Sequence, residues 1–173
     1  MFLVCTIISI VAAIQLAKAQ YEYVVADLPH DFSDFAIQAL DAADMILLVA
    51  SPDMASIRAV TAALDTYEKL DYPKEKIKFV LNAIFPYSTL SKDKLEAALG
   101  MTALATIPYT RDVFVEAINL GQPVVYHKPN LPISNLLEDF AFHVSKDAHK
   151  KAKPENPSDA WNRVFKRYQE RKK

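Results

Sequence analysis

Side chains able to bind a cation or a flat ring stand at three points where short apolar stretches of this sequence end. Asp27 ends one stretch, Asn82 ends another, and Pro108 and Tyr109 follow a third. A carboxylate can hold a magnesium-bound water, an amide can read the edge of a base, and a proline–tyrosine pair can form an apolar wall. In α/β proteins, ligands bind at the carboxyl ends of the strands. Each residue type is also common in turns, so their order along the chain is what indicates a site.

The elements that would position these residues alternate along the chain. The apolar runs are mostly continuous in Val, Ile and Leu, which is typical of a parallel sheet covered on both faces. Helix-like stretches separate the runs, which predicts right-handed crossovers and an α/β fold with a doubly wound, mostly parallel sheet. Gly100 and Gly121 each follow such a stretch, where a left-handed cap is expected. The expected strands are Tyr23–Asp27, Met45–Ala50, Ile77–Asn82, Ala103–Ile107 and Pro123–Tyr126, and the expected helices are Ser33–Ala43, Ala55–Leu70, Ser91–Leu99, Arg111–Leu120 and a longer one from Ile133 to about Lys150.

The two ends of the chain differ from this central pattern. Residues 1–20 form an apolar N-terminal segment, residues 21–151 the α/β domain, and residues 152–173 a linker followed by a basic amphipathic helix that Ser158 can cap. The run from Phe2 to Ala13 is too short to span a bilayer. It lacks the basic residues that begin a signal peptide, although Ala17-Lys18-Ala19 resembles a cleavage site. We expect this run to form a buried strand or helix.

Composition excludes several other kinds of site. The single Cys5 has no partner for an intrachain disulfide or a cysteine metal site, and the four histidines show no metal-ligand spacing. The net charge of −1 conceals an asymmetry: residues 150–173 hold nine basic and three acidic residues, whereas residues 1–149 hold 11 basic and 18 acidic ones. A basic tail on an acidic body indicates either an anionic partner or a solvated charged end.

The segment from Tyr21 to Pro132 resembles the C-terminal part of ParA/MinD-type P-loop ATPases, and most closely the CpaE-like branch linked to pilus assembly. No single motif is decisive, but the series keeps its order without a break. The matching stretches read YVVADLP at 23–29, LDAADMILLVASP at 40–52, FVLN at 79–82, IPY at 107–109 and EAINLGQP at 116–123.

The resemblance implies a domain that binds ATP and Mg2+ at its strand ends and forms a homodimer. Asp27 would match the switch carboxylate near magnesium, and Asn82 the asparagine that reads the base. Pro108 and Tyr109 would lie along the adenine, and Arg111 would line the same rim. The intact protein would be a cytoplasmic ATPase that helps to position a pilus or secretion apparatus, with pilus or secretion proteins as partners.

A phosphate-binding loop is missing from this pattern. Such a loop needs closely spaced glycines followed by Lys and Ser or Thr, because backbone amides must wrap the phosphates. The chain has only Gly100 and Gly121, and neither precedes such a pair; Ala83 also stands where many relatives have arginine. The expected fold is therefore the P-loop NTPase sheet without its N-terminal phosphate-loop unit. ATP binding by this chain is expected to be weak or absent, and no residue is assigned a catalytic role.

The C-terminal helix predicts a second kind of contact. Trp161 and Phe165 lie on one face and Arg163, Lys166 and Arg167 elsewhere, a distribution that suits an anionic membrane surface. Some MinD-type relatives attach to membranes through a similar helix, which implies a peripheral position at the inner membrane face. The alternative is that the aromatic residues dock onto the domain itself or onto a partner. No specific nucleic acid is expected.

Two functions follow from these observations. The first is the C-terminal part of a CpaE-like ATPase, without ATP hydrolysis by this chain alone. The second is a non-catalytic interaction module that acts through its surface and basic tail. A phosphoacceptor receiver domain is a weaker third, because Lys128-Pro129 resembles that family's lysine but the run from Phe2 to Ala13 ends in no acidic pair.

Overall fold

The computed structural model describes residues 2–88 and 90–171. The chain divides into two compact units, each described here by itself. Unit 1 comprises Met1–Leu48 and Tyr67–Lys78, and unit 2 comprises Val49–Thr66 and Phe79–Lys173. Lys172 and Lys173, which belong to the predicted basic tail, lie outside the described residues.

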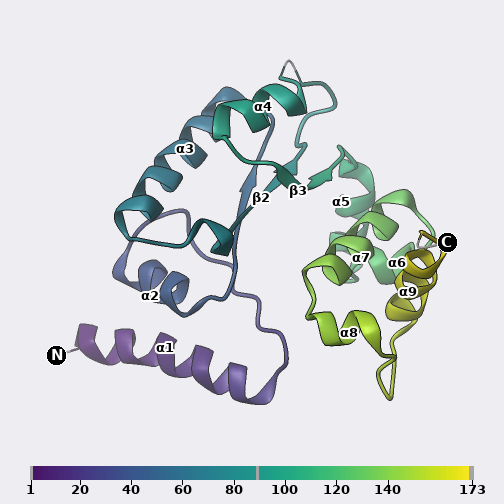
Figure 1. Ribbon diagram of the computed structural model, residues 1–173, viewed down its shortest axis with the longest axis horizontal. Helices are drawn as coiled ribbons and strands as arrows, with labels where there is room; N and C mark the ends of the chain where they lie inside the picture. Colours follow the sequence, from purple (N-terminus) through teal and green to yellow (C-terminus); the bar gives the residue numbers. More distant parts are fainter. Residues whose placement is uncertain (1, 89, 172–173) are drawn as a thin grey trace. The chain divides into compact units, whose positions relative to one another are not determined.

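The strands form an open three-stranded sheet in the order β1-β2-β3 (Figure 1). β2 and β3 are parallel, and their register places Phe79 opposite Ala103 and Asn82 opposite Ile107. The fold is thus α/β, as the alternation of apolar runs and helix-like stretches predicts. The strands are β1 (Ile46–Ala50), β2 (Ile77–Asn82) and β3 (Ala103–Ile107).

Helices make up most of the remaining regular structure. One 3-10 turn, η1 (Lys74–Lys76), precedes β2. The α-helices are α1 (Phe2–Gln20), α2 (Asp34–Ala42), α3 (Met54–Lys69), α4 (Lys92–Leu99), α5 (Arg111–Asn119), α6 (Val124–His127), α7 (Pro132–Val144), α8 (Asp147–Lys151) and α9 (Asp159–Arg171).

The N-terminal apolar segment is a helix in unit 1, which is one of the two forms expected for it, but Ala12 and Ala13 are exposed where burial was expected. α1 packs along α2, and the Lys18 ammonium donates to the Ala42 carbonyl oxygen at 2.7 Å. The same ammonium lies 3.1 Å from a carboxylate oxygen of Asp44. This lysine therefore holds the C-terminal end of α2, where the carbonyl oxygens have no partner within the helix. None of the described helices has the length and apolar character needed to cross a membrane.

The core of unit 2 lies along β2 and beneath α5. Phe79 is fully buried, and Val80 and Leu81 retain 3% and 4% exposure. A second cluster joins buried Ala117 and Val124 to Ile133, with partly buried apolar residues of β3, α5 and α7 packed around them. This cluster fixes α5, α6 and α7 against the end of β3.

Several local predictions are confirmed. Gly100 has φ +62° and caps α4 in the left-handed region, and Gly121 has φ +63° after α5. Ser158 caps α9 as predicted by accepting a hydrogen bond from Trp161 N. Ser33, expected only as the first residue of a helix, caps α2 by accepting one from Ala36 N. The turn residues thus mark the helix ends correctly.

The stretch Tyr23–Asp27 is not a strand, contrary to the prediction. It has no regular structure, and Val25 is 92% exposed. A strand exists only when a neighbour completes its ladder of hydrogen bonds, and the sheet of the described residues consists of β1, β2 and β3. Val24 and Val25 favour a strand by their β-propensity, but propensity alone does not supply the neighbouring strand that the ladder requires.

The predicted strand Pro123–Tyr126 is instead the short helix α6. Pro123 has φ −58° and precedes the helix, and its carbonyl oxygen accepts from His127 N at 3.0 Å. Lys128 N donates to the Val124 carbonyl oxygen at 2.8 Å. These local bonds satisfy the backbone and bury Val124, so they override the strand preference of the valines.

The long helix predicted from Ile133 to about Lys150 is interrupted. α7 ends at Val144 and α8 begins at Asp147. At the break, the Ser145 hydroxyl donates to the Phe142 carbonyl oxygen at 2.7 Å. A serine hydroxyl competes in this way with backbone donors, and Ser145 turns to an extended conformation.

Candidate functional site

The ends of β2 and β3 bring together most of the residues predicted to contact a ligand. Asn82 is the last residue of β2 and lies opposite Ile107, the last residue of β3. Ala83 N donates to the Ile107 carbonyl oxygen at 2.9 Å, which extends the pairing by one residue. Pro108 and Tyr109 therefore leave β3 directly beside Asn82. This adjacency follows from parallel pairing, since the carboxyl ends of neighbouring parallel strands meet at one edge.

The side chains at this edge are accessible. Asn82 is half-buried, Pro108 is exposed, and Tyr109 retains 36% exposure. The Thr110 hydroxyl donates to the Pro108 carbonyl oxygen at 3.2 Å, and Arg111 begins α5 with its side chain exposed. An amide, a flat aromatic side and a cation thus stand within a few residues of one strand end.

The packing of α5 holds the rim formed by Pro108, Tyr109 and Arg111 in place. Val113 and Phe114 pack against the cluster that contains Ala117 and Val124, together with Ile107 of β3. The inward face of the helix is therefore anchored to the same strand that carries Pro108 and Tyr109. Movement of the rim relative to β3 would require breaking this apolar contact.

Asp27 belongs to the other unit of the chain. It is exposed in the irregular segment of unit 1, whereas Asn82, Pro108, Tyr109 and Arg111 all belong to unit 2. Among the described residues, no three His, Cys, Asp or Glu side chains gather as a metal-binding group. The residues that are placed together fit a base, but they do not supply a magnesium shell or a phosphate cradle.

The sequence did not lead us to predict an exposed apolar loop beside Asn82. Ile84 and Phe85 are each 53% exposed and Tyr87 is 90% exposed. Ser88 anchors the loop, because its hydroxyl lies 2.9 Å from the carbonyl oxygen of Pro52 after β1. The signal available in the sequence was the run of large apolar residues directly after the asparagine, outside any expected element.

The sequence analysis also did not identify Asp53, a carboxylate after β1 whose role is structural. An Asp53 carboxylate oxygen accepts from Ser56 N at 2.9 Å in the first turn of α3. This hydrogen bond holds the pKa of Asp53 below its usual range. The pattern of an acidic residue three positions before Ser56 is that of a helix cap, so Asp53 needs no ligand to account for it.

Glu116 of α5 contacts two basic side chains. It is ion-paired with the Lys128 ammonium, and His127 Nε2 lies 2.9 Å from its other oxygen. The hydrogen bonds from Lys128 and His127 hold the pKa of Glu116 below its usual range. Lys128, the lysine that resembles that of a receiver domain, thus links the end of α6 to α5 through its ion pair with Glu116.

Comparison with known proteins assigns the chain to a family. The family model described as cellulose biosynthesis protein BcsQ matches residues 4–137, which is most of the chain. The chain belongs to this family. It is therefore a member of the ParA/MinD-type P-loop ATPases, and the match includes most of α1 and continues to Leu137 of α7.

Curated relatives of this BcsQ-family chain include septum site-determining proteins. The septum site-determining protein MinD of Thermotoga maritima is 26% identical over 126 residues, which cover 70% of this chain and 46% of that protein. An uncharacterised protein of Methanocaldococcus jannaschii is 29% identical over 133 residues, covering 72% of this chain and 51% of that one. The chain thus spans about half the length of the curated relatives it matches.

Solved structures confirm the fold. A ParA family ATPase from Chlorobium tepidum superposes with a TM-score of 0.70 at 24% identity, over 76% of this chain and 55% of the other. MinD from Pyrococcus horikoshii, solved with Mg-ADP, gives a TM-score of 0.70 at 23% identity, over 83% and 58% of the two chains. At these identities the likeness establishes a P-loop NTPase-like fold.

Proposed function

We propose that this chain is the base-contacting C-terminal part of a CpaE-like ATPase that helps to position a pilus or secretion apparatus. The observation that supports the proposal is the register of β2 and β3, which sets Asn82 beside Pro108 and Tyr109. An amide at a strand end can pair with a base edge while the neighbouring apolar wall lies against its ring. Arg111 would line the rim, and Asp27 would serve magnesium only once a phosphate-binding loop is supplied.

Hydrolysis of ATP is not expected from this chain alone. The sequence holds two glycines, and neither is followed by the Lys-Ser or Lys-Thr pair of a phosphate loop. With ATP and Mg2+ the purified chain should release phosphate no faster than buffer. If the chain released phosphate and Asp27→Ala left the rate unchanged, the assignment of Asp27 would be wrong.

The base-contacting residues can be tested with paired variants and adenosine as the probe. Asn82→Ala should weaken adenosine binding roughly five-fold, the effect of about 1 kcal/mol for a lost hydrogen bond. Asn119→Ala on exposed α5 is the matched control and should leave binding unchanged. Tyr109→Ala should also weaken binding, in comparison with Tyr87→Ala on the neighbouring loop. Equal effects of target and control variants would contradict the site.

The biological setting rests on resemblance. The description of the BcsQ family names cellulose biosynthesis, so a role beside a cellulose-producing apparatus competes with the pilus assignment. In either setting we place the chain in the cytoplasm, with contact to the inner face of the membrane through α9. Homodimer formation belongs to the same proposal.

A non-catalytic interaction module is the second candidate, and one surface of unit 2 favours it. Ile118 is 75% exposed, Leu120 55% and Tyr126 66%. They stand on or beside α5 and α6, where an apolar groove of about 430 Å3 is lined by residues such as Phe114 and Leu137. If this surface joins two copies, Ile118→Asp should convert a dimer to a monomer in sedimentation velocity. An unchanged mass for a dimeric chain would exclude this surface as the dimer contact.

A further inference from the structure

The arginines of α9 are engaged by acidic residues of α7. Arg163 Nε donates to one oxygen of Glu138 at 3.0 Å, and Arg167 Nη2 donates to the other at 2.9 Å. Arg167 Nε reaches Asp139 at 2.9 Å, and Arg171 Nη2 reaches its second oxygen at 2.7 Å. The Glu138 side chain is only 3% exposed. Charge complementarity therefore holds α9 along α7.

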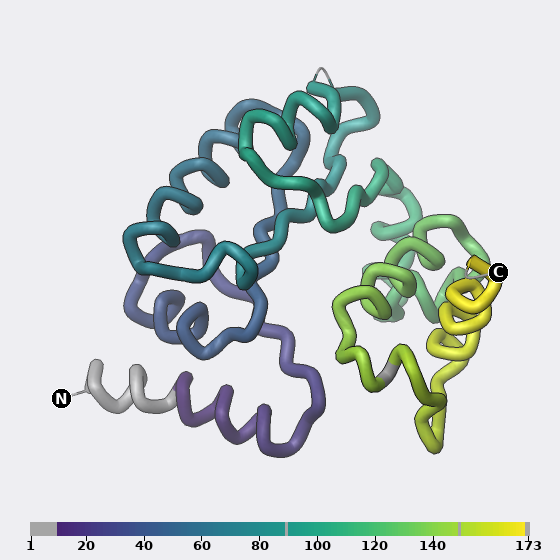
Figure 2. The backbone as a smooth tube through the Cα atoms, in the orientation of Figure 1, coloured from purple at the N-terminus to yellow at the C-terminus, as the bar shows by residue number. Residues whose placement is uncertain are grey.

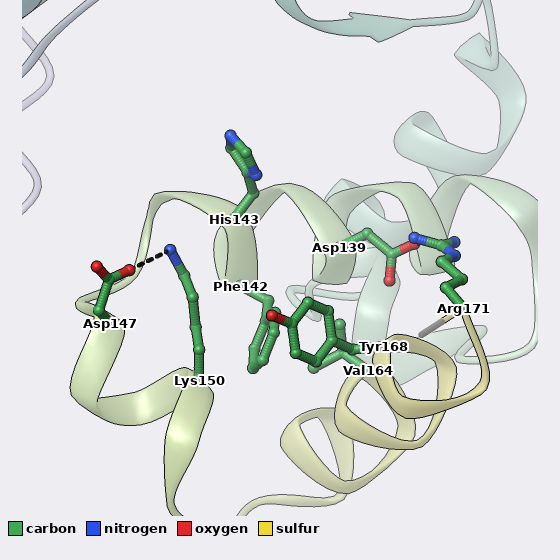
Figure 3. A pocket seen from close by; sticks show the side chains of 8 residues that line it. All are labelled: Asp139, Phe142, His143, Asp147, Lys150, Val164, Tyr168 and Arg171. Atoms are coloured by element: carbon green, nitrogen blue, oxygen red, sulfur yellow. Dashed lines mark hydrogen bonds and ion pairs between the residues drawn. The ribbon is translucent and has the colours of Figure 1, made fainter. Parts of the chain in front are cut away.

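The aromatic face of α9 takes part in the same contact. The rings of Trp161 and Phe165 are stacked 4.5 Å apart, and the Tyr168 ring lies 5.1 Å from Phe142 of α7. Val164 retains 5% exposure. Figure 3 shows Tyr168 and Val164 beside Phe142, with Asp139 directed toward Arg171. Together they line an open pocket of about 570 Å3 between α7, α8 and α9.

Of the five side chains predicted to contact an anionic membrane, all except the exposed Lys166 belong to this docked arrangement. A lipid surface takes up an amphipathic helix through its aromatic residues and through cations that meet the headgroups. In the docked helix, by contrast, the residues that face outward include Asn162, Lys166, Gln169 and Glu170. Docking on α7 and insertion into a membrane therefore require the same face of α9 and exclude each other.

We propose that α9 is a reversible latch, for which the acidic and aromatic face of α7 and an anionic lipid surface compete. This inference rests on the proposed membrane contact of α9. Lipid headgroups would replace Glu138 and Asp139 as partners of the arginines, and acyl chains would replace Phe142. Residues 152–158 form no helix or strand. Fully extended, such a linker can span about 23 Å, so α9 can leave α7 and remain tethered.

Weakening the latch without changing α9 tests the proposal. Glu138→Gln removes the charge that holds Arg163 and Arg167, while every lipid-contacting side chain is kept. Glu155→Gln, on the exposed linker, makes the same change of charge outside the contact and serves as the matched control. The full chain and both variants are sedimented with vesicles of phosphatidylglycerol and phosphatidylethanolamine, and with vesicles of phosphatidylcholine alone.

Trp161 is the only tryptophan and reports directly on α9. Glu138→Gln should bind the anionic vesicles several-fold more than the unsubstituted chain and Glu155→Gln, with a blue shift of Trp161 emission. Binding to phosphatidylcholine should remain low for all three. Far-UV circular dichroism checks that Glu138→Gln is folded; if it is not, Asp139→Asn, at a partly exposed carboxylate, decides in its place.

Two results would overturn the proposal, and they separate its two parts. Equal binding of all three proteins to anionic vesicles would refute the latch while leaving the membrane contact intact. Absence of binding even for a folded variant with weakened docking would refute the membrane contact itself, and the latch with it.

Discussion

At the scale of single residues, Glu116 carries the most specific electrostatic expectation. Its carboxylate is paired with Lys128 and lies within hydrogen-bonding distance of His127, and both contacts lower its pKa from the ordinary 4.5. Because the folded-state pKa is depressed, the resulting stabilisation is present above the unfolded-state pKa. It is lost as the pH falls through the folded-state value.

Substitution of Lys128 should therefore raise the pKa of Glu116. Lys128→Met should raise that pKa toward 4.5, because the ammonium is the largest cause of its depression. The measurement is a carboxyl-detected NMR titration. Lys94→Met, an exposed lysine on α4, is the control and should leave the Glu116 titration unchanged. A folded Lys128→Met chain with the original Glu116 pKa would contradict the contact.

At the same scale, Asp53 should behave as a helix cap. Asp53→Ala should lower the free energy of unfolding, because Ser56 N loses its acceptor. Asp53→Asn keeps an acceptor oxygen and should cost less. Urea unfolding of the three proteins makes the comparison. Equal costs for Ala and Asn would show that capping is not the reason for the loss.

At the scale of elements, glycine conformation ends α4. Gly100 has φ +62°, and a Cβ added there would meet no atom within 4 Å. Gly100→Ala should therefore destabilise the fold by about 1 kcal/mol through backbone strain alone. Gly100→Asn should cost less, since asparagine tolerates this region better. If alanine proved as stable as glycine by urea unfolding, the left-handed cap would be wrong.

The sequence predicts an element well where local signals suffice. β2 and β3 have the expected bounds because apolar runs between turn residues are read locally, and Ser33 and Ser158 mark helix starts through their own hydroxyls. Tyr23–Asp27 could not be predicted, because strand formation depends on a neighbour elsewhere. α6 was missed for the opposite reason, since bonds to Pro123 outweigh the β-branched side chains.

The candidate site likewise contains residues whose positions could be predicted from the sequence and residues whose positions could not. The nearness of Asn82 to Pro108 and Tyr109 was implied once their strands were expected to be parallel, and the register of β2 and β3 places them together. The place of Asp27 depended on a strand that does not form, so its role as a magnesium ligand stays a prediction. The exposed loop with Phe85 and Tyr87 lies in no regular element, and periodicity therefore gave no sign of it.

At the scale of the whole molecule, the chain is a ParA/MinD-type member that covers about half of its curated relatives. Its unit 2 contains the whole of the proposed base-contacting edge and the α7–α9 contact. We propose that the carboxyl ends of β2 and β3 bind a base and make no contacts with phosphates. Such a site should treat adenosine and ATP alike, since a phosphate-binding loop is what distinguishes them.

The most direct measurement is a backbone amide NMR titration of the full chain with adenosine and, separately, with ATP and Mg2+. The account predicts weak, similar affinities for both ligands, with the largest shifts at Asn82, Ala83, Tyr109 and Arg111. Much tighter binding of ATP than of adenosine would contradict it, as would shifts confined to residues away from the ends of β2 and β3.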